Sequence, residues 1–324
     1  MTEIAPPGRT GPVRGRLWAV TTYYNPVGYR RRRANYDVFR RHLGLPLLTM
    51  ELVWGAAPEL GEGDAEILVQ LGGGDVMWQK ERLLNLAVSR LPPECDRFAW
   101  IDCDIVFCDQ DSAERLDRLL DTFLLVQAFD RVRHVTPEWR PGVPVETMTD
   151  FVAPSAIGTI RDGGAPAEVF GASLIERRKL SMGGFAWAAR RELIERCPLY
   201  DAAIAGGGDR LAAGAAYGLT EVMAAHHLMR GPRREHFLAW AERWRSAVGG
   251  ADAIGALHGE ILHLWHGDLA DRRGVERLEG LDALGYDPFN DIALDDRGVW
   301  RWSSDKPRLH GFVRDYLVGR REDG

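Results

Sequence analysis

The sequence has few cysteines and no long apolar segment. Its four cysteines form no Cys-x-x-Cys pair, which excludes a zinc knuckle and a disulfide scaffold. No apolar run approaches the roughly 20 residues that a membrane span requires. Residues 1–16 lack the apolar core of a signal peptide and are rich in Pro, Gly and Arg. We therefore predict a flexible tail there, on a cytoplasmic protein without a transmembrane segment.

The charge balance also excludes one class of function. With a formal net charge of -6, the chain does not have the basic surplus of a protein that coats nucleic acid. A local basic run, Arg30–Arg33, leaves room for an anionic partner, although such a run is more often a solvated helix face. The 324 residues fit one enlarged α/β domain or two fused lobes.

Apolar periodicity indicates strands that alternate with helices. The expected strands are 17–23, 47–53, 66–71, 98–101, 123–129 and 260–265, and the expected helices are 33–43, 78–91, 113–120, 190–196 and 236–248, with an Ala-rich helix after 210. This order predicts a largely parallel sheet flanked by helices, with ligands at the carboxyl ends of the strands. Residues 136–166 are expected to form a long loop, and the chain after Asp268 is polar.

Two acids follow the most apolar of these strands. Asp102 and Asp104 come directly after Phe98–Ile101, and side chains at i and i+2 of an extended backbone point the same way. Two carboxylates placed so close repel one another unless a cation lies beside them. Oxygen ligands suit Mg²⁺ or Mn²⁺, so the motif predicts a divalent metal that also binds substrate phosphates. The alternative is a solvated turn after a strand.

The segment Trp100–Phe107 resembles the Asp-x-Asp motif, flanked by apolar residues, of GT-A glycosyltransferases. This resemblance implies a GT-A fold, a nucleotide-sugar donor and a bound Mn²⁺ or Mg²⁺. It implies that Asp104 ligates the metal, and that Asp102 contacts the ribose or reaches the metal through water.

A second segment agrees with this resemblance. Residues 181–194 and Gly206–Arg210 are similar to the carboxy-terminal module of β-1,4-galactosyltransferases and polypeptide N-acetylgalactosaminyltransferases. The resemblance implies that Gly183 and Gly184 open the donor-sugar pocket. It implies that Asp209 is the catalytic base if transfer inverts the anomeric centre, and that it binds the sugar if transfer retains it. The chain departs from the family pattern here, because its glycine loop has no Trp and only one acid. The alternative is a glycine-rich surface loop.

Two histidines near a predicted strand end are candidate metal ligands. In a continuous strand, His263 would share a face with Trp265, and His266 would lie on the other face. GT-A enzymes of this branch often add a C-terminal His to the metal ligands. We assign that role to His266, because Gly267 beside it lets backbone approach a ligand, and leave His263 as its alternative or as a core histidine.

The donor nucleotide is expected against the first strand. The candidate donor-binding residues, taken from the resemblance, are Thr21, Thr22, Tyr23, Arg30, Arg33, Lys80 and Lys306. Arginine binds phosphate strongly through paired hydrogen bonds. The alternative for Lys80 is a position on an ordinary surface helix, without a role in donor binding.

Together these patterns predict a metal-dependent transferase that moves a hexosyl group from a UDP-sugar to an acceptor hydroxyl. The acceptor is a glycan, a small molecule or, as a minority interpretation, a modified nucleic acid. The alternatives are a sugar-nucleotide nucleotidyltransferase or hydrolase, and an inactive sugar-binding module. We predict one GT-A domain over 17–310, with a nucleotide-sugar half (17–130), an acceptor half (131–310), and a C-terminal tail over 311–324.

Overall fold

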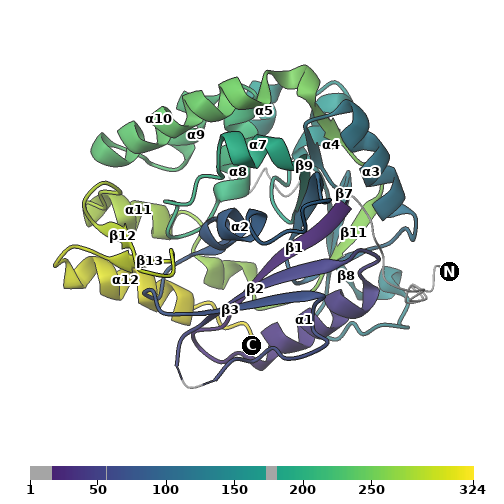
Figure 1. Ribbon diagram of the computed structural model, residues 1–324, viewed down its shortest axis with the longest axis horizontal. Helices are drawn as coiled ribbons and strands as arrows, with labels where there is room; N and C mark the ends of the chain where they lie inside the picture. The colour runs from purple at the N-terminus through teal and green to yellow at the C-terminus, as the bar shows by residue number, and fades with distance from the viewer. Residues whose placement is uncertain (1–16, 56, 173–180) are drawn as a thin grey trace.

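The computed structural model describes residues 17–55, 57–172 and 181–324 (Figure 1). The predicted N-terminal tail, residues 1–16, lies outside them. Among the described residues, the central sheet has seven strands in the order β10-β6-β9-β4-β1-β2-β3. They are β1 (Leu17–Tyr24), β2 (Leu47–Val53), β3 (Ile67–Gly72), β4 (Arg97–Ile101), β6 (Leu125–Gln127), β9 (Ala186–Arg190) and β10 (Ile254–Ala256). The sheet is parallel except for β9, which runs antiparallel to both neighbours. This confirms the predicted α/β class with a mostly parallel sheet.

Two smaller sheets accompany the central one. In the described part of the chain, a four-stranded sheet has the order β5-β11-β7-β8, and β12 pairs with β13. Their strands are β5 (Ile105–Phe107), β7 (Arg131–Val135), β8 (Thr149–Pro154), β11 (Glu260–His263), β12 (Ile292–Leu294) and β13 (Trp300–Trp302). Because β5 follows β4 after three residues, the chain crosses there from the central sheet into the second sheet.

Helices cover both faces of the central sheet (Figure 1). They are α1 (Arg30–His42), α2 (Lys80–Val88), α3 (Ser112–Thr122), α4 (Ala156–Arg161), α5 (Pro166–Gly171), α7 (Arg191–Arg196), α8 (Gly208–Ala216), α9 (Thr220–His226), α10 (Gly231–Val248), α11 (Glu276–Ala283) and α12 (Pro307–Val318), with short 3-10 turns η1 (Val145–Met148), η2 (Ala251–Ala253) and η3 (Leu269–Arg272). None of the helices in the described ranges has the length and apolar character needed to cross a bilayer.

The alternation of β1 explains this layering. Trp18 and Val20 point into a large core shared with α2, α7, α8 and α10, whereas Leu17 and Ala19 point into a second core shared with α1 and α3. Successive strand residues face opposite sides, so a strand that is apolar at every position must be covered on both. The consequence is a buried sheet whose polar residues emerge only at the strand ends.

Several sequence expectations need correction. Residues 136–166, expected as one loop, contain η1, β8 and α4, and α5 starts at their end. The polar stretch after Asp268 contains α11, β12, β13 and α12. Of residues 311–324, expected as a tail, those up to Val318 belong to α12, whose Val313, Tyr316 and Leu317 are buried. The division of the chain at residue 130 stays a prediction, although β9 and β10 complete the same sheet as β1 to β4.

Candidate functional site

The turn between β4 and β5 places the two acids of the Asp-x-Asp motif. The Ile105 N–H donates to the Asp102 carbonyl over 3.2 Å, which folds residues 102–105 into a tight turn. Strand β5 then pairs antiparallel with β11, and this register sets His263 opposite Ile105. The Leu264 N–H donates to the Asp104 carbonyl over 2.8 Å. Asp104 and His263 are therefore neighbours because of strand pairing, although 158 residues separate them along the sequence.

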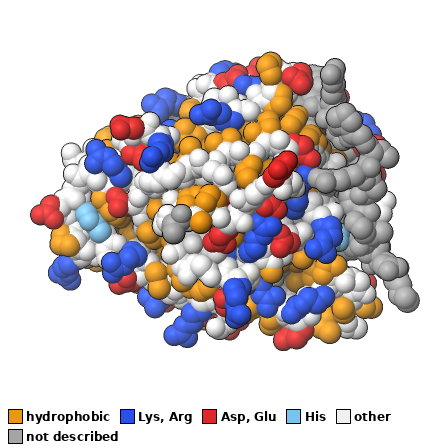
Figure 2. Space-filling model, turned by 60° about the horizontal axis from the view of Figure 1, so that its bottom comes forward, with side chains coloured by type: hydrophobic (Ala, Val, Ile, Leu, Met, Phe, Trp, Pro, Cys, Tyr) orange, Lys and Arg blue, Asp and Glu red, His pale blue; other side chains and the backbone are white. Residues whose placement is uncertain are grey.

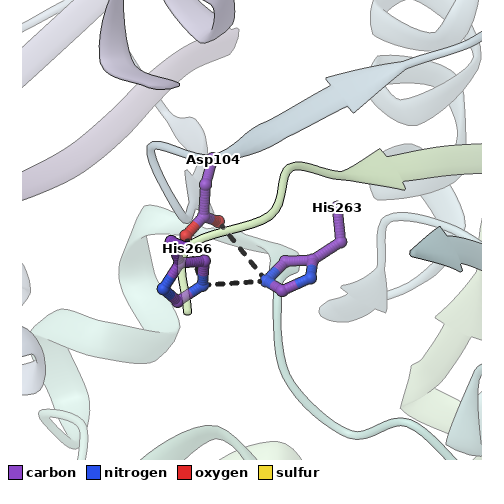
Figure 3. A group of neighbouring side chains, drawn as sticks. All are labelled: Asp104, His263 and His266. Carbon is purple, nitrogen blue, oxygen red and sulfur yellow. Dashed lines mark hydrogen bonds and ion pairs between the residues drawn. The ribbon is translucent and has the colours of Figure 1, made fainter. Parts of the chain in front are cut away.

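Asp104, His263 and His266 converge into one cluster (Figure 3). His266 Nε2 lies 3.0 Å from Asp104 Oδ2 and 3.1 Å from His263 Nε2. His263 Nε2 lies 4.0 Å from Asp104 Oδ1. Within the described ranges, these are the side chains grouped closely enough to hold a metal ion, with candidate ligand atoms all within 4.8 Å of one another.

The protons available in this cluster do not satisfy its acceptors. Burial and the neighbouring His134 hold the pKa of His263 well below its usual range, so this imidazole is neutral. Arg272 donates to His266 Nε2 over 2.8 Å, and the same nitrogen faces the Asp104 carboxylate. Asp104 Oδ1 is buried and has no hydrogen-bond partner. A buried carboxylate oxygen without a partner, facing two imidazole rings, fits a divalent cation.

The electrostatics of Asp104 agree with this fit. Burial alone favours the neutral acid, but the contact with His266 and the charge of Arg272 outweigh it and hold the pKa of Asp104 well below its usual range. The carboxylate is thus ionised, as a metal ligand must be.

Asp102 has a different environment from Asp104. Its Oδ1 lies 2.5 Å from Lys80 Nζ, and Lys80 also contacts Asp209 Oδ2 over 2.6 Å. Burial raises the pKa of Asp102 to about 6, opposed by Lys80 and reinforced by Asp209 and Asp104. The structure places Asp102 outside the His cluster, so its assignment as a metal ligand stays a prediction.

Asp209 lies in the first turn of α8 and is held from both sides. Trp100 Nε1 donates to its Oδ1 over 3.0 Å, and Lys80 donates to its Oδ2. A Cβ placed on Gly184 would lie 3.7 Å from this carboxylate, so the Gly-Gly segment passes directly beside it. Lys80 thus joins the Asp-x-Asp turn to the glycine loop that precedes α8.

The glycine loop is closely fitted to α2. A Cβ on Gly208 would come within 2.3 Å of Glu81 Oε1, so only glycine fits this position. Gly207 has φ +99°, a left-handed conformation that glycine adopts without strain. Gly183 packs on Arg210, where a Cβ would lie 3.4 Å from the arginine side chain.

The candidate donor-binding residues of β1 have structural partners. Thr21 is buried, and its hydroxyl donates to the Ile101 carbonyl over 2.6 Å. The Tyr23 hydroxyl donates to Glu59 over 2.5 Å. Thr22 is partly exposed and lies on the opposite face of β1 from these two. Of the three, Thr22 is therefore the side chain with access to a ligand.

The remaining basic candidates lie apart from the cluster. Arg30 is 94% exposed beside Asp323. Arg33 makes two hydrogen bonds of 2.9 Å to Asp64. Lys306 contacts Asp291 over 2.9 Å. Their roles in donor binding stay predictions, and each has an intramolecular partner here.

Sequence reasoning named Arg32 only within the run Arg30–Arg33 and did not single out Arg272, Arg320 and Glu322. Arg272 and Glu322 lie beside His266, and Arg32 and Arg320 contact Glu322. Glu322 is 1% exposed and receives hydrogen bonds from Arg32 Nε and NH2 over 2.8 and 2.5 Å. This contact joins residues 290 apart in the sequence. The only local signal was the adjacency of Arg272 to the histidine segment, because the contact itself requires α12 to return to α1.

No protein-family model matches the chain, and no curated protein does either. Among solved structures, it is similar to glucosyl-3-phosphoglycerate synthase from Mycobacterium tuberculosis in complex with Mn²⁺, UDP and phosphoglyceric acid. The identity is 14%, with 82% of this chain and 76% of that chain covered and a TM-score of 0.39. S. aureus TarS 1-349 is similar at 12% identity, with 71% of each chain covered and a TM-score of 0.35. Since these TM-scores lie below 0.5, no activity is carried over from these proteins.

Proposed function

We propose that the chain is a metal-dependent glycosyltransferase of the GT-A type that moves a hexosyl group from a UDP-sugar to an acceptor hydroxyl. The observation that carries this proposal is the convergence of two sets of side chains at the carboxyl end of β4. One set is the imidazole side, Asp104, His263 and His266. The other is the lysine side, Lys80, Asp102 and Asp209. A sugar diphosphate needs both a cation and polar groups for the sugar, and this edge of the sheet offers both.

The imidazole side would hold the metal. Two imidazole nitrogens and one carboxylate suit a transition ion such as Mn²⁺ better than Mg²⁺, which prefers oxygen ligands. When bound, the cation supplies Lewis-acid neutralisation of the charge that develops on the diphosphate. His134 would orient His263, since the two Nδ1 atoms lie 2.9 Å apart and the contact leaves His263 Nε2 for the metal.

The lysine side would position the sugar and the acceptor. Asp102 is 30% exposed and is available to a ribose hydroxyl once Lys80 moves to a phosphate or to Asp209 alone. Asp209 would accept the proton of the acceptor hydroxyl if transfer inverts the anomeric centre, and would bind the sugar if transfer retains it. Trp100 fixes the Asp209 carboxylate through its indole N–H. The nucleotide would lie along the carboxyl end of β1, near Thr22.

A UDP-release assay tests this proposal. We expect UDP release from a UDP-hexose in the presence of Mn²⁺, increased by an acceptor pool of glycans and small hydroxylated molecules and abolished by a chelator. Asp209→Asn should lower the rate about 100-fold, within the range for loss of a general base. Asp315→Asn, at an exposed side chain on α12, is the matched control and should keep the full rate.

The other outcomes would identify the alternatives. UDP release that no acceptor increases would indicate a hydrolase, and pyrophosphate release from UTP with a sugar phosphate would indicate a nucleotidyltransferase. Mn²⁺-dependent binding of UDP-sugars without any release would indicate an inactive module. Each of these three results would overturn the proposed transfer reaction.

A further inference from the structure

Three arginines lie around Glu322 and the neighbouring His266. Arg32 donates twice to Glu322, and Arg320 Nε lies 3.1 Å from Glu322 Oε1. Arg272 donates to His266 Nε2, and Glu322 Oε1 lies 3.9 Å from His266 Nδ1. The arginines and the imidazole side of the site therefore share one wall, and Glu322 lies between them.

The positive charge here exceeds what Glu322 can balance. Arg32 is 16% exposed at its side chain, Arg320 6% and Glu322 1%. The guanidinium of Arg272, like those of Arg32 and Arg320, is charged at neutral pH, because arginine does not lose its proton in proteins. Glu322 contacts two of the three guanidinium groups, those of Arg32 and Arg320, whereas Arg272 contacts the His266 imidazole. Buried charge that is not fully paired is costly. An anion with more charge and more oxygens than a carboxylate would match them better.

Glu322 reaches this position on a short C-terminal strap, residues 319–324. The strap passes over Gly267, where a Cβ would lie 2.7 Å from the Arg320 carbonyl and 2.8 Å from the Arg321 carbonyl. Gly267 has φ +86°, so a side chain is disfavoured there for two reasons. The strap thus covers the turn that carries His266, which is 8% exposed.

Polar contacts hold the strap against α1. The Asp323 carboxylate accepts from the Arg30 and Arg31 N–H groups over 3.2 and 2.7 Å, and so caps a helix whose own N-cap residue provides no side-chain bond. The Tyr29 hydroxyl donates to the Val318 carbonyl and accepts from the Arg321 N–H. Figure 1 shows this end of the chain close to α1. Contacts of this kind can be exchanged with water or with a ligand at little cost.

The face turned forward in Figure 2 shows basic and acidic side chains interspersed over the surface. An excess of one charge is therefore a property of the buried arginine group around Glu322 and not of this surface. This contrast favours a specific anion site over general attraction of anions to the protein.

We propose that Arg32, Arg272 and Arg320 form an oxyanion subsite next to the imidazole side, and that Glu322 occupies it until a diphosphate displaces the strap. The inference deepens the proposed function, since the anion is then the diphosphate of the sugar donor. Glu322 acts as an intramolecular competitor, so donor affinity includes the cost of moving the strap. The subsite itself requires no metal and no transfer reaction.

Inorganic pyrophosphate in the presence of EDTA tests the subsite without the metal. We expect Glu322→Gln to bind pyrophosphate at least about tenfold more tightly than the unmodified chain in calorimetry, because the competing charge is removed while the side-chain shape is kept. The variant should also have a lower melting temperature, and pyrophosphate should raise it more than it raises that of the unmodified chain. The second readout applies even to a destabilised variant.

Two further variants distinguish competition by the Glu322 carboxylate from a general loosening of the strap. Asp323→Asn releases the strap from α1 without changing the arginine group. Its affinity for pyrophosphate should increase less than that of Glu322→Gln. Arg320→Met in the Glu322→Gln background should remove the gain. Equal gains in Asp323→Asn and Glu322→Gln, or no gain in Glu322→Gln, would overturn the subsite.

The proposed transfer reaction and this subsite can fail separately. A chain that releases no UDP, but whose Glu322→Gln variant binds pyrophosphate more tightly, keeps the subsite and loses the transferase. A chain that transfers sugar, but whose Glu322→Gln variant gains nothing, keeps the transferase and loses the subsite.

Discussion

Asp102 and Asp104 are separated by one residue, yet they belong to two regions with opposite electrostatics. On the lysine side, Lys80 provides an internal cation between Asp102 and Asp209, and the pKa of Asp102 is still raised to about 6. On the imidazole side, the carboxylate of Asp104 is ionised and faces the Nε2 atoms of two imidazoles, with no lysine beside it in the described part of the chain. The comparison teaches that one motif can serve two purposes. The Asp102 carboxylate is held in position by Lys80, whereas the Asp104 carboxylate, which has no such lysine, fits a bound cation.

Removal of the internal cation should have the largest effect on stability. Lys80→Met leaves Asp102 and Asp209 without their shared partner, and the Asp209 side chain is only 10% exposed. Breaking such a buried pair costs about 3–5 kcal/mol of the free energy of unfolding. Urea unfolding at neutral pH measures this loss.

Arg234→Met is the matched control, because Arg234 pairs with Glu221 and both side chains are exposed, at 43% and 64%. Its cost should be about 1 kcal/mol. Equal losses for the two variants would show that Lys80 is an ordinary surface ion pair, and the distinction between the two regions would be lost.

Metal binding should depend on Asp104 far more than on Asp102. Asp104→Asn should lower Mn²⁺ affinity at least about 100-fold, since it removes the only charged ligand of the cluster. Asp102→Asn should lower it less than about tenfold, because Lys80 already neutralises that carboxylate. Electron paramagnetic resonance of free Mn²⁺ measures both without any substrate. Equal losses would return Asp102 to the role of ligand that the sequence predicted.

The parts of the fold that could be predicted are those whose signal is local. Leu47–Val53 is an unbroken β-prone run, and β2 has these bounds. β8 escaped prediction because it borders the second sheet and its residues are only half buried, so its pattern is weak. The missed helix α12 had a signal in Pro307 and in buried positions that repeat at helical spacing. The polar composition of the chain end masked it.

The residues of the candidate site likewise divide into those with a local signal in the sequence and those without one. Asp102 and Asp104 are recognisable because they directly follow one apolar strand. The expectation that they point the same way was wrong, because residues 102–105 form a turn and the two side chains have different partners. The expectation that His263 and His266 point apart assumed a strand as far as Trp265, whereas β11 ends at His263. The chain turns there, and both rings reach Asp104.

Lys80 was predicted as a donor-binding residue from the resemblance, but its contacts with Asp102 and Asp209 were not. These contacts, like that of Glu322 with Arg32, join distant elements, so no spacing in the sequence could reveal them.

The smallest expected effect concerns a third carboxyl on the lysine side, and it tests the contrast with the imidazole side. Glu81 is 3% exposed and receives a hydrogen bond from Trp78 Nε1 over 3.0 Å. Burial raises its pKa to about 8, opposed by Lys80 and reinforced by Asp209 and Asp102. The unfolded chain ionises this group near its ordinary pKa of 4.5, so the folded state binds more protons between about pH 4.5 and pH 8. The folded state must therefore lose stability through Glu81 as the pH rises across that window.

Glu81→Gln removes this titration. From pH 6 to pH 8, the unmodified chain should lose about 2 kcal/mol more of its unfolding free energy than the variant, since one pKa unit corresponds to about 1.4 kcal/mol. Glu242→Gln, at a side chain that is 69% exposed, should leave the slope unchanged. Urea unfolding at pH 6, 7 and 8 measures the three slopes. Parallel curves for Glu81→Gln and the unmodified chain would mean that Lys80 balances all three carboxyls, and that the lysine side carries no excess of negative charge to set it apart from the imidazole side.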